Sequence, residues 1–199
     1  NVANTVSLTT GTQKNQTYVS VGAVNARGII QNNDLDRYNF SVRNTTSMLN
    51  DKLTMDLSFM YSNVKEQNML SQGEYANPLV PVYLFPRGDD FSKYQYYERY
   101  DVDRNIKTQF WPLKENGLSM QNPYWITNRN MYTNKKDRFL ASGSLKYTIT
   151  DWLNVSGRVK LDKETINSEK KMYASTLNVI AENSDKGAYV QSNKNTSQI

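Results

Sequence analysis

The sequence lacks two residue types that most catalytic and metal sites use, because it contains no cysteine and no histidine. Without cysteine it can form no disulfide, thiolate metal site or cysteine nucleophile, and without histidine it lacks the commonest general base and metal ligand. We therefore expect no catalytic residues, no metal and no other cofactor, and we expect that the chain is not an enzyme. One alternative stays open, which is Ca²⁺ bound by loop carboxylates at Asp89, Asp90, Asp101 and Asp103.

Apolar residues are also scarce. They make up 38% of the chain, the mean hydropathy is −0.73, and no apolar run reaches the roughly 18 residues of a transmembrane helix. Aromatic residues nevertheless make up 12%, which argues against disorder. A polar chain with many aromatic residues is typical of a membrane β-barrel, whose lumen and loops are wet and whose rims carry aromatic rings.

Positive charge is not concentrated anywhere. The net charge of +5 is divided as +1 over residues 1–66, +1 over 67–137 and +3 over 138–199. A nucleic-acid-binding module would gather its Lys and Arg on one face. We therefore expect no nucleic-acid partner.

Proline is missing from most of the chain, since all five prolines lie between residues 67 and 137. The proline-free segments 37–49, 52–62 and 138–163 alternate apolar and polar residues, so each predicted strand has an apolar face and a wet face. About ten residues is the length that a tilted strand needs to cross a bilayer. The predicted fold class is all-β, with antiparallel strands of a large transmembrane β-barrel and long extracellular loops.

The connections are sorted by length. Short turns at 11–16, 50–51 and 150–151 fall at one end of the predicted antiparallel strands, and the longer connections fall at the other. This asymmetry is typical of outer-membrane barrels, in which the short turns are periplasmic. Trp152 is then expected at the periplasmic interface, where indole rings are favoured.

Charged residues occupy the wet face of the predicted strands. Because buried charges need water or a partner, they favour a wide barrel with a hydrated or plugged interior. The residues concerned are Arg37, Arg43, Lys52, Asp56, Arg138, Lys146, Arg158 and Lys160.

The predicted organisation has four parts. Residues 1–66 form barrel strands and short turns, 67–137 a large extracellular loop, 138–165 a barrel hairpin, and 166–199 a polar extracellular loop or partly disordered segment. We interpret the chain as an excerpt of a longer protein, because it begins in mid-strand without a signal peptide.

The loop 67–137 is expected to fold on itself as a cap, because it holds 13 of the 23 aromatic residues. Its prolines argue against regular sheet there. The residues expected to structure this loop are Asn77, Pro78, Pro81, Phe85, Pro86, Arg87, Gly88, Asn122 and Pro123.

In their order and spacing, the loop motifs resemble those of the SusC/RagA family of TonB-dependent outer-membrane transporters. The flanking segments 18–22 and 150–153 are similar to that family's early barrel strands, and the resemblance covers roughly residues 1–165. The motifs that carry it are Asn77-Pro78 running to Pro86-Arg87-Gly88, then Trp111-Pro112, then Asn122-Pro123-Tyr124-Trp125.

The resemblance implies a bacterial outer-membrane protein whose barrel of about 22 strands is closed by a plug. It implies two protein partners: a SusD-like surface lipoprotein that forms a lid, and TonB, which is contacted through parts absent from this chain. The implied function is import of oligosaccharides, or glycan fragments; import of oligopeptides is the alternative within the family.

A third possibility is a soluble or surface-attached carbohydrate-binding β-domain. Such a domain would bury its apolar face against a second sheet, whereas a barrel would present that face to lipid. The residues that distinguish the two are Phe40, Met55, Leu57, Phe59, Leu145 and Val159.

Aromatic and basic residues of the loop are candidates for contact with substrate or lid, because aromatic faces bind the apolar faces of sugar rings. The alternative is that the same rings hold the loop together. The candidates are Tyr94, Tyr96, Tyr97, Arg99, Tyr100, Trp111 and Trp125.

Overall fold

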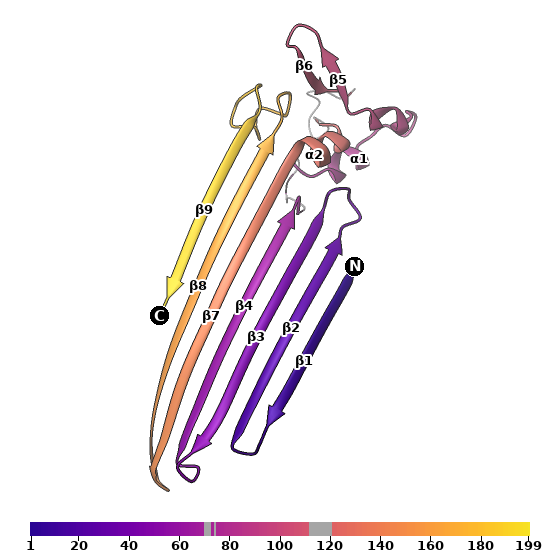
Figure 1. The fold of residues 1–199 in the computed structure, drawn as a ribbon. Helices are drawn as coiled ribbons and strands as arrows, with labels where there is room; N and C mark the ends of the chain where they lie inside the picture. Colours follow the sequence, from indigo (N-terminus) through magenta and orange to yellow (C-terminus); the bar gives the residue numbers. More distant parts are fainter. Residues whose placement is uncertain (70–72, 74, 112–120) are drawn as a thin grey trace.

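Seven long strands pair in one antiparallel sheet in the order β1-β2-β3-β4-β7-β8-β9. A computed structural model describes residues 1–69, 73, 75–111 and 121–199. Every strand of this sheet pairs with the strands next to it in the chain, apart from the insertion between β4 and β7 (Figure 1). The predicted all-β, antiparallel architecture is confirmed. The strands are β1 (Val2–Gly11), β2 (Asn15–Arg27), β3 (Asp34–Met48), β4 (Leu53–Gln67), β7 (Asn130–Thr150), β8 (Leu153–Met172) and β9 (Ala188–Gln198).

The insertion between β4 and β7 contains short elements. These are α1 (Leu79–Tyr83), a 3₁₀ helix (Phe91–Gln95), β5 (Glu98–Asp101), β6 (Ile106–Gln109) and α2 (Pro123–Arg129). Strands β5 and β6 form a separate two-stranded sheet. The expectation that this region contains no regular sheet is therefore wrong for residues 98–109, a stretch without proline.

Two predicted boundaries are also wrong. Strand β7 begins at Asn130 rather than near 138, and β8 continues to Met172. The predicted polar loop 166–199 instead contains the end of β8 and all of β9, which pair over Asp162–Met172. The pattern fails here because the upper parts of these strands are polar on both sides, so their side chains do not alternate.

Short turns lie at the lower end of the sheet, and the longer connections lie at its upper end (Figure 1). The β3–β4 turn places Leu49, Asn50 and Asp51 at positive φ, and Ser47 Oγ donates to Asp51 Oδ1 (2.7 Å). Trp152 lies beside the lower turn of β7–β8 and is exposed. The described residues of 28–33, 68–129 and 173–187 meet at the opposite end (Figure 1).

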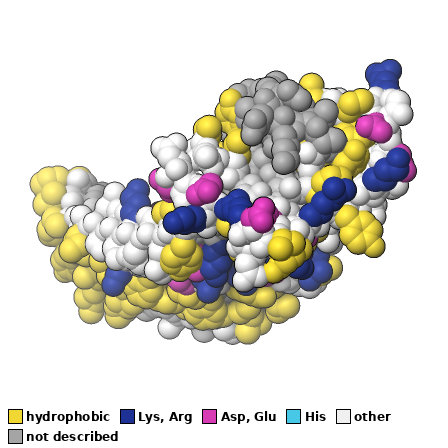
Figure 2. Space-filling view, turned by 90° about the horizontal axis from the view of Figure 1, so that it is seen from above, with side chains coloured by type: hydrophobic (Ala, Val, Ile, Leu, Met, Phe, Trp, Pro, Cys, Tyr) yellow, Lys and Arg dark blue, Asp and Glu magenta, His cyan; other side chains and the backbone are white. Residues whose placement is uncertain are grey.

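Strand register gathers the apolar side chains on one face. One cross-strand row runs from Val21 through Phe40 and Tyr61 to Phe139. Within the described residues nothing covers this face: Leu145 is 52% exposed and Val159 is 68% exposed. Seen from above, hydrophobic side chains gather along the lower edge of the view (Figure 2).

The apolar band crosses the strands obliquely. On β2 it is centred on Val21, and on β8 on Gly157. The cross-strand row that starts at Val21 on β2 ends at Lys163 on β8, four strands away. Along β8, Lys163 lies six residues above Gly157. At ~3.3 Å per residue and ~4.8 Å per strand, this offset is ~20 Å along the strands over ~19 Å across them. The strands therefore make an angle of ~45° with the perpendicular to the band.

The opposite face is polar, and several of its charges are paired. Arg43 pairs with Asp56 (2.6 Å) and Arg138 with Asp162 (2.6 Å), each across neighbouring strands. Lys136 pairs with Glu164 (2.8 Å) on the same face. Because these pairs lie where water has access, they stabilise the sheet only modestly.

Candidate ligand-binding site

The upper connections form a folded unit with its own core, which we call the cap: the described residues of 75–129 and 173–187. Tyr94, Trp111, Trp125, Ile126 and Ala181 are the buried hydrophobic side chains of the described chain. All of them belong to the cap and none to the seven-stranded sheet. The cap therefore supplies the closely packed interior that the strands lack.

Asn122 holds the centre of the cap. It is fully buried, and its Nδ2 donates to the carbonyl oxygens of Tyr94 (2.8 Å) and Phe110 (3.0 Å). Its Oδ1 accepts from the Tyr124 backbone N–H (2.8 Å), which caps the N-terminus of α2, and Pro123 follows at the first helical position. The Asn-Pro motif thus both starts a helix and joins two other segments.

Aromatic rings pack around this centre. Phe85 lies edge-on to Phe91 (5.0 Å between centroids) and to Tyr94 (5.5 Å). Tyr94 also contacts Phe110 (5.4 Å) and Trp111 (5.4 Å). Such ring pairs stabilise beyond their buried area.

The remaining loop motif supports this cluster. Asn77 Oδ1 accepts from the Leu79 backbone N–H (3.0 Å), and Pro78 and Pro81 are buried. Pro86, Arg87 and Gly88 form an exposed turn, closed by a bond from the Asp89 N–H to the Pro86 oxygen (3.2 Å). Pro112, another residue of the motif, lies outside the described residues.

Side-chain hydrogen bonds join the connections to one another. Trp125 Nε1 donates to Thr176 Oγ1 (3.0 Å), and Thr176 in turn donates to Asn130 Oδ1 (2.7 Å). Asn32 Nδ2, from the β2–β3 connection, donates to the Thr127 oxygen (3.0 Å). Segments far apart in the sequence are thereby held together at one rim of the sheet.

A charged cluster fastens the β5–β6 hairpin to α2. Glu98 accepts from Arg129 (2.6 Å) and from Lys107 (2.7 Å). Burial by itself raises the pKa of Glu98, but the hydrogen bonds from Lys107 and Arg129 outweigh it and lower the pKa below its ordinary value. The Arg129 guanidinium also lies over the ring of Tyr173 (4.8 Å to the centroid).

Acidification is expected to loosen this hairpin. A carboxylate whose folded pKa is lowered stabilises the fold above its unfolded pKa, and this contribution is lost as pH falls through the folded value. Glu98→Gln should therefore cost about 1–3 kcal/mol of local stability at neutral pH. The difference from wild type should vanish in acid, below the ordinary Glu value of 4.5. Hydrogen exchange of 98–109, corrected for intrinsic rates, measures both effects. Asp103→Asn, in the same hairpin, is the control; a variant difference unchanged in acid would contradict the assignment.

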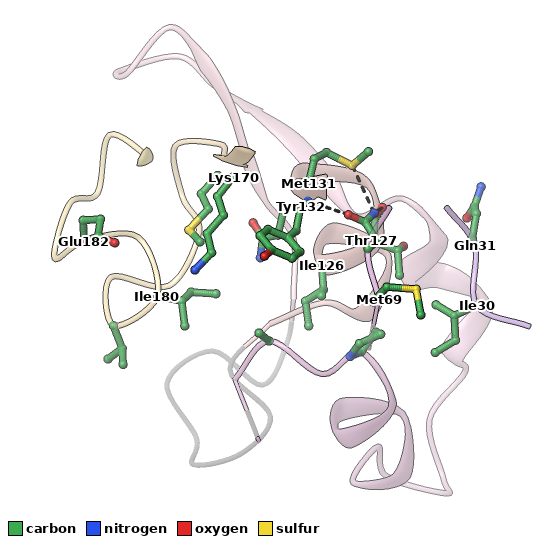
Figure 3. Close-up of a pocket in the computed structure, with 16 residues that line it drawn as sticks. Ile30, Gln31, Met69, Ile126, Thr127, Met131, Tyr132, Lys170, Ile180 and Glu182 are labelled. Atoms are coloured by element: carbon green, nitrogen blue, oxygen red, sulfur yellow. Dashed lines mark hydrogen bonds between the residues drawn. The ribbon is translucent and has the colours of Figure 1, made fainter. Parts of the chain in front are cut away.

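A cavity of about 640 Å³ lies under the cap at the top of the sheet. Its strand residues include Tyr132 and Lys170, which have the parity of the polar face. Nine of its sixteen lining residues are apolar, and Lys170 and Glu182 lie toward one end (Figure 3). Its apolar lining includes Ile30, Met69, Ile126, Met131, Met172 and Ile180.

Hydrogen bonds shape the cavity wall. The Tyr132 backbone N–H donates to Asn68 Oδ1 (2.8 Å), and Asn68 Nδ2 donates to the Thr127 oxygen (3.3 Å). These bonds join the end of β4 to β7 and α2, beside Met69 and Met131 (Figure 3). A cavity lined by both aliphatic and polar groups is suited to binding an organic ligand by burial of its apolar part.

The residues predicted to contact substrate or lid are divided by the structure. Tyr94, Trp111 and Trp125 are buried in the cap core, so they stabilise the cap and offer no surface to a ligand. Tyr97 is half-buried against Trp125 (6.4 Å), and Tyr96 is 82% exposed.

Two further candidates lie at the surface. Tyr100 is exposed and donates to Asn105 Oδ1. The Arg99 guanidinium lies 3.2 Å from the centroid of the Phe110 ring. None of the seven predicted residues is among those that line the large cavity. The sequence carried no signal for the cavity, whose residues come from three separate connections and from the upper ends of β7 and β8.

The carboxylates considered for Ca²⁺ lie in turns. Asp90 accepts from the Ser92 N–H (3.0 Å) and Oγ (2.6 Å), and Asp101 accepts from the Arg104 N–H (3.1 Å). Among the described residues no cluster of three or more His, Cys, Asp or Glu side chains could hold a metal ion. No helix in the described part of the chain has the length and hydropathy needed to span a membrane.

Two comparisons with known proteins gave negative results. No protein-family model matches this sequence, and no curated protein sequence matches it.

Proposed function

We propose that this chain forms part of the wall and extracellular loops of a TonB-dependent outer-membrane importer of the SusC/RagA type. In this proposal the strands belong to a closed barrel of about 22 strands, and the cap lies on the extracellular side. A SusD-like lipoprotein covers the mouth, and TonB acts through parts outside this chain. The imported substrate is an oligosaccharide.

The uncovered apolar face is the observation that carries the proposal. A soluble β-domain would bury these side chains against a second sheet, whereas Leu145, Val155 and Val159 are all exposed. The oblique course of the band supports a membrane further, because ~45° is the tilt typical of strands that cross a bilayer. A flat soluble interface gives no reason for this offset.

The two ends of the sheet support an outer-membrane orientation. Short turns lie at one end and the cap at the other (Figure 1), as in barrels with periplasmic turns and extracellular loops. Above the band the strands are polar on both faces, which suits a wall that rises out of the lipid into water.

The cavity favours oligopeptides as a second candidate substrate. Sugar sites place aromatic rings against the ligand, whereas in this lining Met and Ile side chains outnumber the one aromatic side chain, Tyr132. Flexible Met side chains adapt to aliphatic groups of different shapes, and Lys170 can pair with a carboxylate. The cavity is thus better suited to a peptide side chain than to a sugar ring.

Fractionation and uptake test the proposal. We expect the intact protein in the outer-membrane fraction, monodisperse only with detergent, and we expect its deletion to abolish uptake of one oligosaccharide or oligopeptide class. Competition between labelled oligosaccharides and aliphatic oligopeptides then identifies the class. Protein that stays monomeric in detergent-free buffer would contradict the proposal and favour the soluble β-domain.

A further inference from the structure

A furrow runs down the apolar face between β4 and β8. Its floor is formed by Ala141 and Gly143 on β7, which pair with Phe59 and Leu57 on β4. On the other side these two small residues pair with Leu161 and Val159 on β8. The depression has a volume of about 500 Å³. Small residues flanked by larger ones on both neighbouring strands thus produce a channel open to the surroundings of the sheet.

Three lysines lie above this furrow on the same face. Lys65 on β4 and Lys135 on β7 are directly opposite in register, and Lys163 follows Leu161 on β8 at the same parity. Because the band falls by about one and a half residues per strand, the three follow its oblique upper boundary. On β2 and β3 the residues level with Lys65 are Asn25 and Asp36, which carry no positive charge, and Arg27, one same-face position higher on β2, is paired with Asp34 (3.5 Å). The basic residues of this row that lack an ion pair therefore lie on β4, β7 and β8.

The three lysines are available to bind an anion. All three are exposed, and among the ion pairs of the described residues none involves Lys65, Lys135 or Lys163. Like charges directly opposite on a sheet are unfavourable, and Lys65 and Lys135 form such a pair.

Four carboxylates share this face, and each already has a partner. Asp34 pairs with Arg27 (3.5 Å), and Glu169 pairs with Lys171 (3.1 Å) and accepts from the Tyr189 hydroxyl (2.7 Å). Asp137 Oδ1 accepts from the Tyr61 hydroxyl (2.6 Å) and from Asn63 Nδ2 (2.7 Å). Asp36, opposite Lys65, accepts from Asn25 Nδ2 (2.7 Å). These four groups lower the positive potential of the row, but three lysines without an ion pair above an apolar furrow still match a ligand with an anionic head and an apolar tail.

We propose that the furrow and the lysine row bind a phosphate-bearing anionic lipid of the surrounding leaflet. An acyl chain lies along Ala141 and Gly143, and the anionic headgroup lies along the row of Lys65, Lys135 and Lys163. Lysines just outside the hydrocarbon region attract anionic headgroups, and the furrow supplies apolar contact that an ordinary flat barrel surface lacks. This inference rests on the proposed membrane location of the apolar face.

Lipid titration of the intact protein in detergent tests the site. Native mass spectrometry would compare phosphatidylglycerol with phosphatidylcholine of the same acyl chains. We expect preferential retention of the anionic lipid, lost at high salt, with affinity falling about fivefold for each lysine changed to Gln. Lys146→Gln, on the polar face of β7, is the matched control and should change nothing.

Substitutions in the furrow and in the lysine row distinguish the contribution of the acyl chain to binding from that of the headgroup. Ala141→Leu should weaken binding of both lipids, whereas Lys135→Gln with Lys163→Gln should abolish only the preference. Equal retention of both lipids in wild type, or a preference untouched by the lysine changes, would overturn the lipid site. Protein that still requires detergent in that case leaves the importer proposal standing; protein that is monodisperse without detergent removes both.

Discussion

Leu145→Arg is expected to prevent stable insertion of the sheet, whereas Ser144→Arg on the adjacent residue is tolerated. Leu145 belongs to the apolar band and is half exposed, with Met55 and Gly157 opposite it. An arginine on the lipid face near the midplane costs about 2–4 kcal/mol. Ser144 lies on the polar face opposite Asp56 and Arg158, where a new guanidinium stays in water.

Outer-membrane recovery of the intact protein and its urea unfolding in lipid vesicles measure this pair of variants. We expect little folded Leu145→Arg protein and near wild-type recovery of Ser144→Arg. Leu145→Met, which conserves volume and apolarity, should also behave as wild type. If the two arginine variants were equally stable, the apolar face would not meet hydrocarbon and the importer proposal would fail.

Trp125→Ala is expected to disorganise the cap while leaving the strands in place. Trp125 is fully buried, and its Nε1 donates to Thr176 (3.0 Å). Removing a buried Trp side chain typically costs about 3–5 kcal/mol. Because Thr176 also donates to Asn130 at the start of β7, the loss should extend to the contact between α2 and the 173–187 connection.

Hydrogen exchange of the intact protein reports this effect segment by segment. Protection should fall in 91–111 and 173–187, while β1–β4 remain protected. Tyr96→Ala is the matched control, since it removes an aromatic ring that is 82% exposed. Trp125→Phe should show an intermediate loss, because it keeps much of the packing and removes the hydrogen bond. Unchanged protection in Trp125→Ala would mean that the cap is not held by its aromatic core.

Strand assignment from sequence succeeded where one face is apolar and failed where neither is. Residues 37–49 and 52–62 alternate in composition, and all of them except Leu49 and Lys52, which lie in the turn, are in strands. The upper part of β8, which ends at Met172, and all of β9 carry polar residues on both faces. With water on both sides there is no selection for alternation, so these strands resemble loop sequence until their pairing is known.

The loop residues illustrate a different limit. Composition correctly indicated a folded cap, but it could not tell which aromatic side chains form the core and which reach solvent. Trp111 and Trp125 are buried, whereas Tyr96 and Tyr100 are exposed, although all are of similar chemical type. The cavity was missed because Ile30, Met69 and Ile180 are single apolar residues in separate connections, without a shared motif.

The parity of the strands, their antiparallel order and the sorting of short and long connections are determined by the sequence alone. The reason is local: successive side chains of a strand point to opposite faces, and a two-residue turn reverses the chain. Register, the oblique band, the furrow beneath three lysines and the cavity under the cap are decided only in three dimensions. Each depends on which residues of distant segments are hydrogen-bonded side by side, and that pairing is a property of the assembled sheet.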